Sequence, residues 1–331
     1  HDFGVVADIA DRVIVMKKGE IVEAGRALDV LLNPQHPYTR ALIDAIPRLT
    51  KTEPVEEVER APLLKVEGLQ KTFSTGSGTL FGKRRVVKAV QDVSFDLYAG
   101  ETIGIVGESG SGKSTVGRCL VRLLHPDGGR VLMDGVDIAH MAGAELHAQR
   151  RKLQMIFQDP FSSLNPRARV SRILTEGMIA YGMPDKEAKA RARELLELVG
   201  LDETAMKRFP HEFSGGQRQR IGIARALALE PAIIIADEAV SALDVSIQAQ
   251  VLDLLAELKV RLHLSMLFIT HDLRVAARIC DRIIVMQKGQ IVEAGPVGKV
   301  LHDPDTAYTR SLREAIPGQD YERSLAAADA G

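Results

Sequence analysis

Residues Gly107 to Ser114 read GESGSGKS, which places glycines, a lysine and a hydroxyl at a fixed spacing. The glycines allow sharp backbone turns, so the N–H groups can converge on phosphate oxygens. Lys113 would reach the β- and γ-phosphates of a nucleoside triphosphate, and Ser114 would place its hydroxyl on Mg²⁺. The predicted contact residues are Gly107, Glu108, Ser109, Gly110, Ser111, Gly112, Lys113, Ser114 and Thr115. A loop that binds nucleotide without hydrolysing it remains an alternative.

Two adjacent acids, Asp237 and Glu238, end the apolar run Ile233–Ala236 about 120 residues after this loop. A carboxylate at the end of a buried strand is well placed to hold Mg²⁺, so Asp237 is the predicted partner of Ser114. Glu238 points in another direction and is the predicted group that orients or activates an attacking water. Two adjacent acids after a strand are more often solvated residues of a loop. Here the phosphate loop that precedes them in the sequence favours the catalytic interpretation.

The segments around the loop have the patterns needed to position it. Thr102–Val106 is a continuous apolar run, typical of a buried parallel strand. After the loop, Val116, Leu120, Leu123 and Leu124 fall on one face of a predicted helix. The glycine-rich loop would therefore join a strand to a helix N-terminus, where the helix dipole also favours anions.

Further strands are predicted on both sides of this unit. Leu63–Gly68 and Val93–Leu97 suggest two short strands joined by a loop with a basic patch at Lys83–Arg85. An Asp-Gly pair within Val131–Asp137 predicts a hairpin. The remaining predicted strands are Ile233–Ala236, Met266–Thr270 and Ile283–Met286.

A proline-punctuated region with one clear amphipathic helix, Lys186–Val199, interrupts the alternation of strands and helices. Gly200 supplies the stop signal of that helix. Strand–helix alternation indicates an α/β fold with a helical insertion.

Phe213 to Arg220 reads FSGGQRQR and resembles the LSGGQ signature of the ABC ATPase family. Ser214 can cap a helix, and the glycines after it permit a close approach to an anion. In the family this element, here Ser214, Gly215, Gly216 and Gln217, binds the γ-phosphate of ATP held by the opposite domain. Phe213 replaces the leading leucine of the family, and we expect this change to be harmless.

Other elements of the family occur in the expected order. Gln158 resembles the glutamine that contacts Mg²⁺ and faces the permease, and Asp244 lies in a segment that resembles the loop crossing the dimer interface. His271 resembles the switch histidine at the γ-phosphate, and Phe73 resembles the aromatic that stacks on adenine. Ala239 stands where the family usually has proline, which should loosen that turn modestly.

The resemblance implies a P-loop NTPase of the ABC ATPase type with a parallel core sheet, an antiparallel β subdomain and a helical signature subdomain at about residues 159–225. It implies ATP and Mg²⁺ as ligands, with Ser114, Gln158 and Asp237 around the metal. Two such domains would sandwich two ATP molecules.

Three segments narrow the resemblance to oligopeptide and dipeptide importers. They are Gln158–Arg167 (QDPFSSLNPR), Ala239–Gln250 (AVSALDVSIQAQ) and Asn33–Arg40 (NPQHPYTR). The implied partners are integral membrane permease subunits, an extracytoplasmic solute-binding protein acting through them, and a second ABC ATPase domain. The implied location is the cytoplasmic face of a bacterial inner membrane, as a peripheral subunit. The alternatives are an exporter motor, a translation or DNA-repair ATPase of the same fold, and a non-enzymatic scaffold.

Residues 1–47 align without gaps to residues 271–317, and about half of the paired residues are identical. Two copies one domain length apart indicate tandem homologous domains rather than a solenoid. We expect residues 1–49 to be the C-terminal tail of an upstream ATPase domain, 50–62 a linker, 63–318 a complete ATPase domain and 319–331 a tail. The chain would then be a piece of a longer protein.

Composition bears on the remaining function classes. The formal net charge is −1 and tryptophan is absent, so neither a basic field nor a base-stacking platform indicates nucleic acid binding. Cys119 and Cys280 lie in mostly apolar stretches and are predicted to be buried free thiols. No apolar run approaches the ~20 residues that span a bilayer, so a membrane function would require a partner chain.

Overall fold

The computed structural model describes residues 3–46, 61–75, 85–159 and 163–318. Its centre is a six-stranded sheet whose inner strands β5, β9 and β10 are buried along their whole length. Every neighbouring pair is parallel except the β11–β12 pair at one edge. Across the sheet the strands are β12 (Gln290–Pro296), β11 (Arg282–Gln287), β5 (Thr102–Val106), β10 (Ser265–Ile269), β9 (Ile233–Asp237) and β8 (Leu153–Ile156). The predicted parallel core sheet is confirmed.

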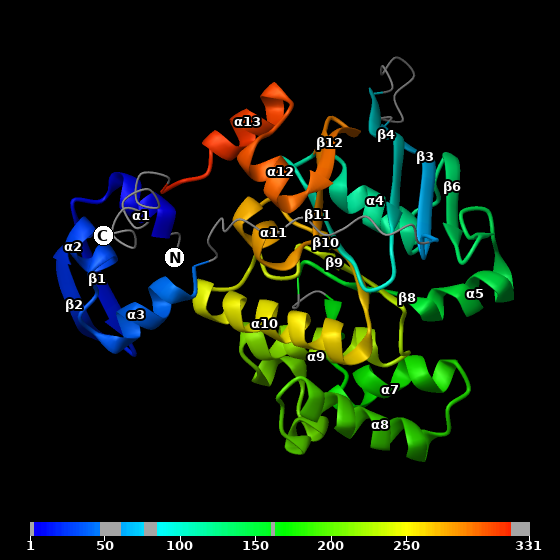
Figure 1. The fold of residues 1–331 in the computed structure, drawn as a ribbon. Coiled ribbons are helices and arrows are strands. Elements are labelled where there is room, and N and C mark those ends of the chain that lie inside the picture. The colour runs from blue at the N-terminus through cyan, green and yellow to red at the C-terminus, as the bar shows by residue number, and fades with distance from the viewer. Residues whose placement is uncertain (1–2, 47–60, 76–84, 160–162, 319–331) are drawn as a thin grey trace.

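A second, four-stranded antiparallel sheet packs beside the core sheet (Figure 1). Its strands are, in order, β4 (Arg85–Leu97), β3 (Leu64–Thr75), β6 (Gly128–Met133) and β7 (Val136–Asp137). The predicted hairpin around the Asp-Gly pair is confirmed as β6–β7.

The predicted strands Leu63–Gly68 and Val93–Leu97 were too short. The register of β3 and β4 shifts three times, and Gly68 and Asp92 adopt positive φ angles of 59° and 56°. Because of these irregularities, the hydrogen bonding between β3 and β4 continues through polar residues that interrupt the alternation of apolar and polar side chains. Lys83 lies outside the described residues.

The helical insertion forms a separate layer at the β8–β9 side of the core sheet (Figure 1). Its apolar residues belong to the same core cluster as Ile234 and Phe268 of the sheet. The elements are α7 (Val170–Ala180), α8 (Asp185–Leu198), two 3₁₀ turns (Glu203–Lys207 and Pro210–Glu212) and α9 (Gly215–Leu227). Helix α8 ends before Gly200, whose φ is +71°, as the sequence predicts.

Helix α4 (Lys113–Leu120) opens directly on the phosphate loop and is shorter than its apolar pattern predicts. Arg122 adopts a φ of 58° and ends the helical path, so Leu123 is 54% exposed rather than on the buried face. Leu124 still packs against the core. The other helices of this part are α5 (Gly143–Lys152), α10 (Val245–Leu262), α11 (Leu273–Ile279), α12 (Val297–His302) and α13 (Ala307–Glu314).

Residues 3–46, here called the N-terminal unit, repeat the elements of residues 271–317, the C-terminal unit. In both units a helix, two antiparallel strands and two helices follow one another. The two strand pairs even share an irregularity, between Val15 and Met16 in one and Val285 and Met286 in the other. The N-terminal elements are α1 (Phe3–Ile9), β1 (Arg12–Lys17), β2 (Glu20–Arg26), α2 (Ala27–Leu32) and α3 (Pro37–Asp44).

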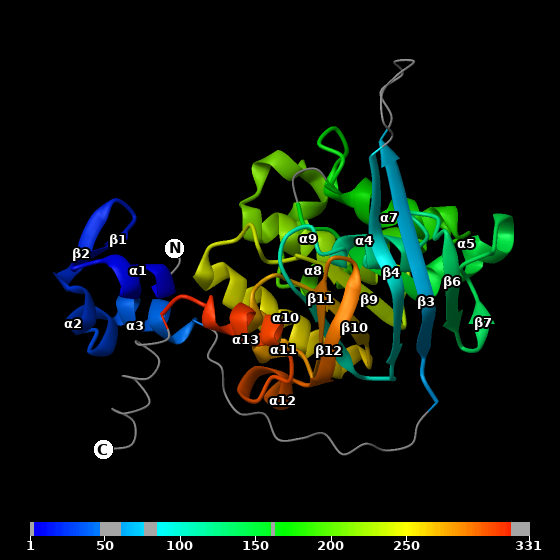
Figure 2. The same ribbon diagram turned by 90° about the horizontal axis from the view of Figure 1, so that it is seen from above.

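The N-terminal unit stands apart from the two sheets, on the side of α13 (Figures 1 and 2). The Gly318 N–H donates to Asp8 Oδ2 at 2.7 Å, and Arg278 Nη1 donates to Ala45 O at 3.4 Å. In the N-terminal unit, β1 and β2 form a separate two-stranded sheet.

Both cysteines are buried and unbridged, as predicted. Burial raises the pKa of the Cys119 thiol to about 11, and it also raises the pKa of Cys280. Among the described residues, no helix combines the length and the apolar character needed to cross a bilayer.

The packing of α4 on the core sheet gives a first test. A Cβ added to Gly117 would lie 2.7 Å from Ile269 Cδ1 and 3.2 Å from Ile235 Cγ2. Because overpacking costs about 1–3 kcal/mol and exceeds the helix-propensity gain of about 1 kcal/mol, Gly117→Ala should lower the free energy of unfolding in urea.

The matched control is Gly222→Ala in α9, where an added Cβ meets no atom within 4 Å. This variant should raise the free energy of unfolding by up to about 1 kcal/mol. Equal shifts in the two variants would contradict the close contact between α4 and the sheet.

Candidate nucleotide-binding site

The phosphate loop joins β5 to α4 and passes two neighbouring backbones very closely. An added Cβ would lie 2.2 Å from Met286 O at Gly107 and 2.2 Å from Ala89 O at Gly112. Both glycines also have positive φ angles, 144° and 105°. The loop can therefore take this path only with glycine at these two positions.

Lys113 begins α4 and is only 4% exposed. Its ammonium donates to Gly107 O at 2.7 Å and to Glu108 O at 2.8 Å, so it lies across the inside of the loop. Burial lowers the pKa of Lys113, and the carboxylates of Glu238 and Asp237 act in the opposite direction. The hydroxyl of Ser111 is buried nearby and has no hydrogen-bond partner among the described residues. This cradle holds donors that suit phosphate oxygens.

Asp237 and Ser114 form the adjoining oxygen site. The Ser114 hydroxyl donates to Asp237 Oδ1 at 2.7 Å, and Arg118 Nη2 lies 3.9 Å from Asp237 Oδ2. Asp237 is 1% exposed, and this burial raises its pKa although Ser114 and Arg118 oppose the shift. One carboxylate and one hydroxyl fit Mg²⁺, which uses few protein ligands when substrate phosphates complete its shell. The described residues contain no cluster of three or more His, Cys, Asp or Glu side chains suited to a metal.

Glu238 lies directly after β9 with a φ of 47°, an uncommon conformation for a residue with a side chain. Its N–H donates to Ile269 O at 2.9 Å, and its own carbonyl accepts from the Ser241 N–H and hydroxyl at 3.1 and 3.0 Å. These bonds hold the turn in which Ala239 replaces the proline of the family.

Gln158 and His271 converge on the same carboxylate. Gln158 Nε2 donates to Glu238 Oε2 at 2.8 Å, and His271 Nδ1 lies 3.4 Å from Glu238 Oε1. The Glu238 side chain is 15% exposed, whereas that of His271 is 55% exposed. Three residues predicted separately from distant motifs therefore meet at one point of the structure.

One cavity of about 1300 Å³ is lined by most of the phosphate loop with Lys113 and Ser114, and by Gln158, Glu238 and His271. Asp237 is hydrogen-bonded to Ser114 but is not among the lining residues. Val86, Val87 and Lys88 of β4 also line this cavity. Val86 and Val87 are 57% and 45% exposed, an apolar surface that suits the flat face of a base. Sequence reasoning missed them, because exposed valines on a strand carry no sequence signal. Phe73 pairs with Val87 across the β3–β4 ladder and is 38% exposed, but it is not among the cavity-lining residues.

The signature residues lie away from this cavity. Ser214 caps α9, accepting from the Gln217 N–H at 3.3 Å, while Gln217 Oε1 accepts from the Ser214 N–H at 3.1 Å. Gly215 and Gly216 open the same helix, and a Cβ at Gly216 would lie 2.4 Å from Ile247 Cγ2 of α10. None of these residues lines the cavity of the phosphate loop.

Asp244 caps the neighbouring helix. It accepts from the Ile247 N–H at 3.0 Å and from the Ser246 hydroxyl at 2.8 Å. Between Asp244 and Glu238 lie Ser241 and Leu243, which do line the cavity.

Known proteins share the fold of this chain. A dimeric bacterial ABC transporter cassette, MJ0796, superposes with a TM-score of 0.63 at 31% identity, covering 71% of this chain and 98% of that one. The chain belongs to the ABC transporter ATPase family. A family model described as ABC transporter matches residues 90–241, and one described as oligopeptide/dipeptide transporter, C-terminal region, matches residues 22–85.

Among curated relatives, this ABC ATPase is 48% identical to the glutathione import ATP-binding protein GsiA of Shigella dysenteriae and to that of Escherichia coli K12. Each alignment covers 96% of this chain and 55% of the relative, so the chain spans about half the length of the relatives it matches. The cassette CbiO1 of Clostridium perfringens superposes with a TM-score of 0.64 at 25% identity and is covered completely.

The burial of Asp237 gives a prediction for the ABC ATPase without nucleotide. Since its folded-state pKa lies above the ordinary value of 3.8, the ionised carboxylate lowers stability at neutral pH. This cost disappears as the pH falls through the raised pKa toward 3.8. Asp237→Asn should therefore raise the free energy of unfolding at pH 7 by on the order of 1 kcal/mol, with a smaller gain at pH 5.

Thermal unfolding from pH 5 to pH 8 measures this effect. Asp185→Asn is the control, since Asp185 pairs with Lys189 at an exposed site and should change stability by less than about 0.5 kcal/mol. A loss of stability in Asp237→Asn at pH 7 would contradict the assigned cost of burial.

Proposed function

We propose that this chain binds MgATP, hydrolyses it, and powers the import of small peptides or peptide-like solutes through a separate membrane permease. The observation that carries the proposal is that three groups meet at one cavity, which Ser114 lines and to which Asp237 is joined by its hydrogen bond with Ser114. They are the glycine loop with Lys113, the Ser114–Asp237 oxygen pair, and Glu238 with its two partners. The named function of the glutathione-import relatives supports import rather than export.

Each group has a separate task in the proposed reaction. The loop N–H groups and Lys113 bind and orient the phosphates, and Glu238 orients the attacking water and accepts its proton. Gln158 and His271 hold that carboxylate, and His271 also donates toward the transferring phosphoryl group. Mg²⁺, when held by Ser114, Asp237 and Gln158, would neutralise phosphate charge. Val86 and Val87, with Phe73 beside them, would contact the adenine.

A second ATPase domain completes this site in the proposal. Ser214 to Gln217 lie away from the cavity of their own chain, so they would serve the ATP held by a partner domain, across an interface that includes Asp244. The chain alone should therefore bind MgATP but hydrolyse it slowly, at a rate that rises more than linearly with protein concentration as two copies pair.

Hydrolysis assays test this proposal. Lys113→Ala should abolish tight MgATP binding. Glu238→Gln should retain binding, lower hydrolysis by at least about a hundredfold, and accumulate an ATP-bound dimer on size-exclusion chromatography. Glu257→Gln, an exposed glutamate on α10, is the control and should behave like the parent.

Rapid hydrolysis by Glu238→Gln, or by a demonstrated monomer at a concentration-independent rate, would contradict these roles. Reconstitution with the membrane permease tests import itself: hydrolysis should rise when a binding protein loaded with glutathione or a short peptide is added. The chain would then act at the cytoplasmic face of the inner membrane as a peripheral subunit.

We further propose that residues 1–49 are the tail of an upstream ATPase domain, joined by a linker at 50–62 to the domain at 63–318. The support is a comparison of exposure between the two units. Ile14 and Met16 are 60% and 56% exposed, whereas their counterparts Ile284 and Met286 are 2% and 0% exposed. In the C-terminal unit β11 pairs with β5, whereas β1 pairs with β2 and with no strand like β5 among the described residues. The N-terminal unit thus exposes an apolar face on β1. In the proposal, the strand and the helix that cover this face belong to the upstream domain.

Matched substitutions test the proposed tail. In this chain Ile284→Lys should unfold the ATPase domain, because a buried ammonium is left unpaired, whereas Ile14→Lys should leave the melting temperature unchanged. In a longer protein that includes the upstream domain, both should destabilise. If Ile14→Lys destabilises this chain as much as Ile284→Lys does, the face of β1 is already covered and the proposal fails.

A further inference from the structure

Besides the close approach of Met286 to Gly107, the C-terminal unit forms two hydrogen bonds with the phosphate loop. The Gly289 N–H, in the turn between β11 and β12, donates to Ser111 O at 2.9 Å. The Tyr308 hydroxyl, on α13, accepts from the Glu108 N–H at 3.3 Å. The Glu108 N–H shares its peptide unit with the Gly107 carbonyl, which accepts from Lys113 Nζ at 2.7 Å. The carbonyl of Glu108 itself, in the next peptide unit, accepts from Lys113 Nζ and from the Ser111 N–H. The tyrosine thus supports the peptide unit on which the lysine rests.

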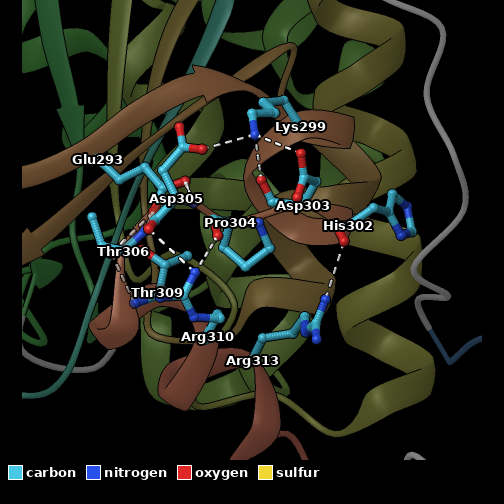
Figure 3. A network of polar contacts seen from close by, with 10 residues as sticks. All are labelled: Glu293, Lys299, His302, Asp303, Pro304, Asp305, Thr306, Thr309, Arg310 and Arg313. Atoms are coloured by element: carbon cyan, nitrogen blue, oxygen red, sulfur yellow. Dashed lines mark hydrogen bonds and ion pairs between the residues drawn. The ribbon is translucent and has the colours of Figure 1, made fainter.

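An anchor on β12 fixes the position of α13 (Figure 3). Glu293, 8% exposed, accepts from the Asp305 N–H at 2.8 Å and from the Thr306 N–H and hydroxyl at 3.1 and 3.0 Å. Thr306 then caps α13, and Arg310 closes the loop by donating to Pro304 O at 2.9 Å. Tyr308 follows Thr306 by two residues, so this anchor sets where its ring lies.

The N-terminal unit contains the same anchor without a phosphate loop beside its tyrosine. Glu23 accepts from the Gln35 and His36 N–H groups at 2.8 and 3.1 Å, and Arg40 donates to Pro34 O at 2.9 Å. Tyr38, the counterpart of Tyr308, lies with its ring 4.7 Å from Lys17 Nζ. The anchor therefore forms in the absence of a contact with the loop, and the hydroxyl contact of Tyr308 is an addition to it.

We propose that Tyr308 is a positioning residue for ATP: its hydroxyl holds the Glu108 peptide so that the loop is preformed for the phosphates. The inference rests on the proposed binding of MgATP. Removing the hydroxyl leaves the Glu108 N–H without this acceptor and lets the loop sample other conformations, a cost that appears when ATP binds. The C-terminal unit is thereby part of the nucleotide site.

The test compares Tyr308→Phe with the matched control Tyr38→Phe, using MgATP itself in titration calorimetry and in steady-state assays. Tyr308→Phe should weaken MgATP binding about three- to tenfold, the effect expected of one hydrogen bond. KM should rise by a similar factor while kcat at saturation stays within about twofold, and the melting temperature without nucleotide should not change. Tyr38→Phe should match the parent in every measurement.

A second variant separates positioning from folding. Glu293→Gln weakens the anchor, so it should also raise the Kd for MgATP. In the double variant with Tyr308→Phe, the fold-increase in Kd should be smaller than the product of the fold-increases of the two single variants. The inference is overturned if Tyr308→Phe binds MgATP like the parent, or if it loses melting temperature and kcat instead of affinity. Failure of the parent chain to bind MgATP would overturn the proposed function as well, which distinguishes the two failures.

Discussion

Close approach of backbone to backbone is the constraint on which the candidate site depends. Gly107 passes the carbonyl of Met286 and Gly112 passes the carbonyl of Ala89, each too closely for a side chain. Those two carbonyls belong to different sheets, since Met286 lies on β11 and Ala89 on β4. The path of the phosphate loop therefore depends on how the core sheet and the antiparallel sheet pack together.

The same region accepts electrostatic and conformational costs that an ordinary core avoids. Lys113 and Asp237 are both buried. Burial lowers the pKa of Lys113 and raises the pKa of Asp237, and each shift favours the uncharged form of the side chain. Glu238 adopts a positive φ, and the hydroxyl of Ser111 is buried without a partner among the described residues. Such costs persist when the surrounding packing over-determines them, and they cluster at functional sites. Here β5, β9 and β10, the most buried strands, supply that packing.

Patterns of apolar residues, glycines and acids within short segments were enough to predict much of this structure. The inner strands are continuous apolar runs, α8 has a clear apolar face with a glycine stop, and the glycine loop and acidic pair have fixed spacing. The sequence did not predict the lengths of β3 and β4, because bulges at Gly68 and Asp92 override alternation. It misplaced Leu123 because a single backbone angle at Arg122 ends the helix before the apolar pattern does. It missed Val86, Val87 and Tyr308, since their place in the cavity wall or at the loop arises from contacts between distant segments.

The contact between Gly216 and Ile247 has a mechanical consequence. It presses the first turn of α9 against the first turn of α10, at a distance that leaves no room for even a methyl group between them. Ser214 begins one of these helices and Asp244 begins the other. The helical layer therefore cannot approach α10 more closely at this point. Two caps that are 30 residues apart in sequence thus begin helices whose first turns are in direct contact.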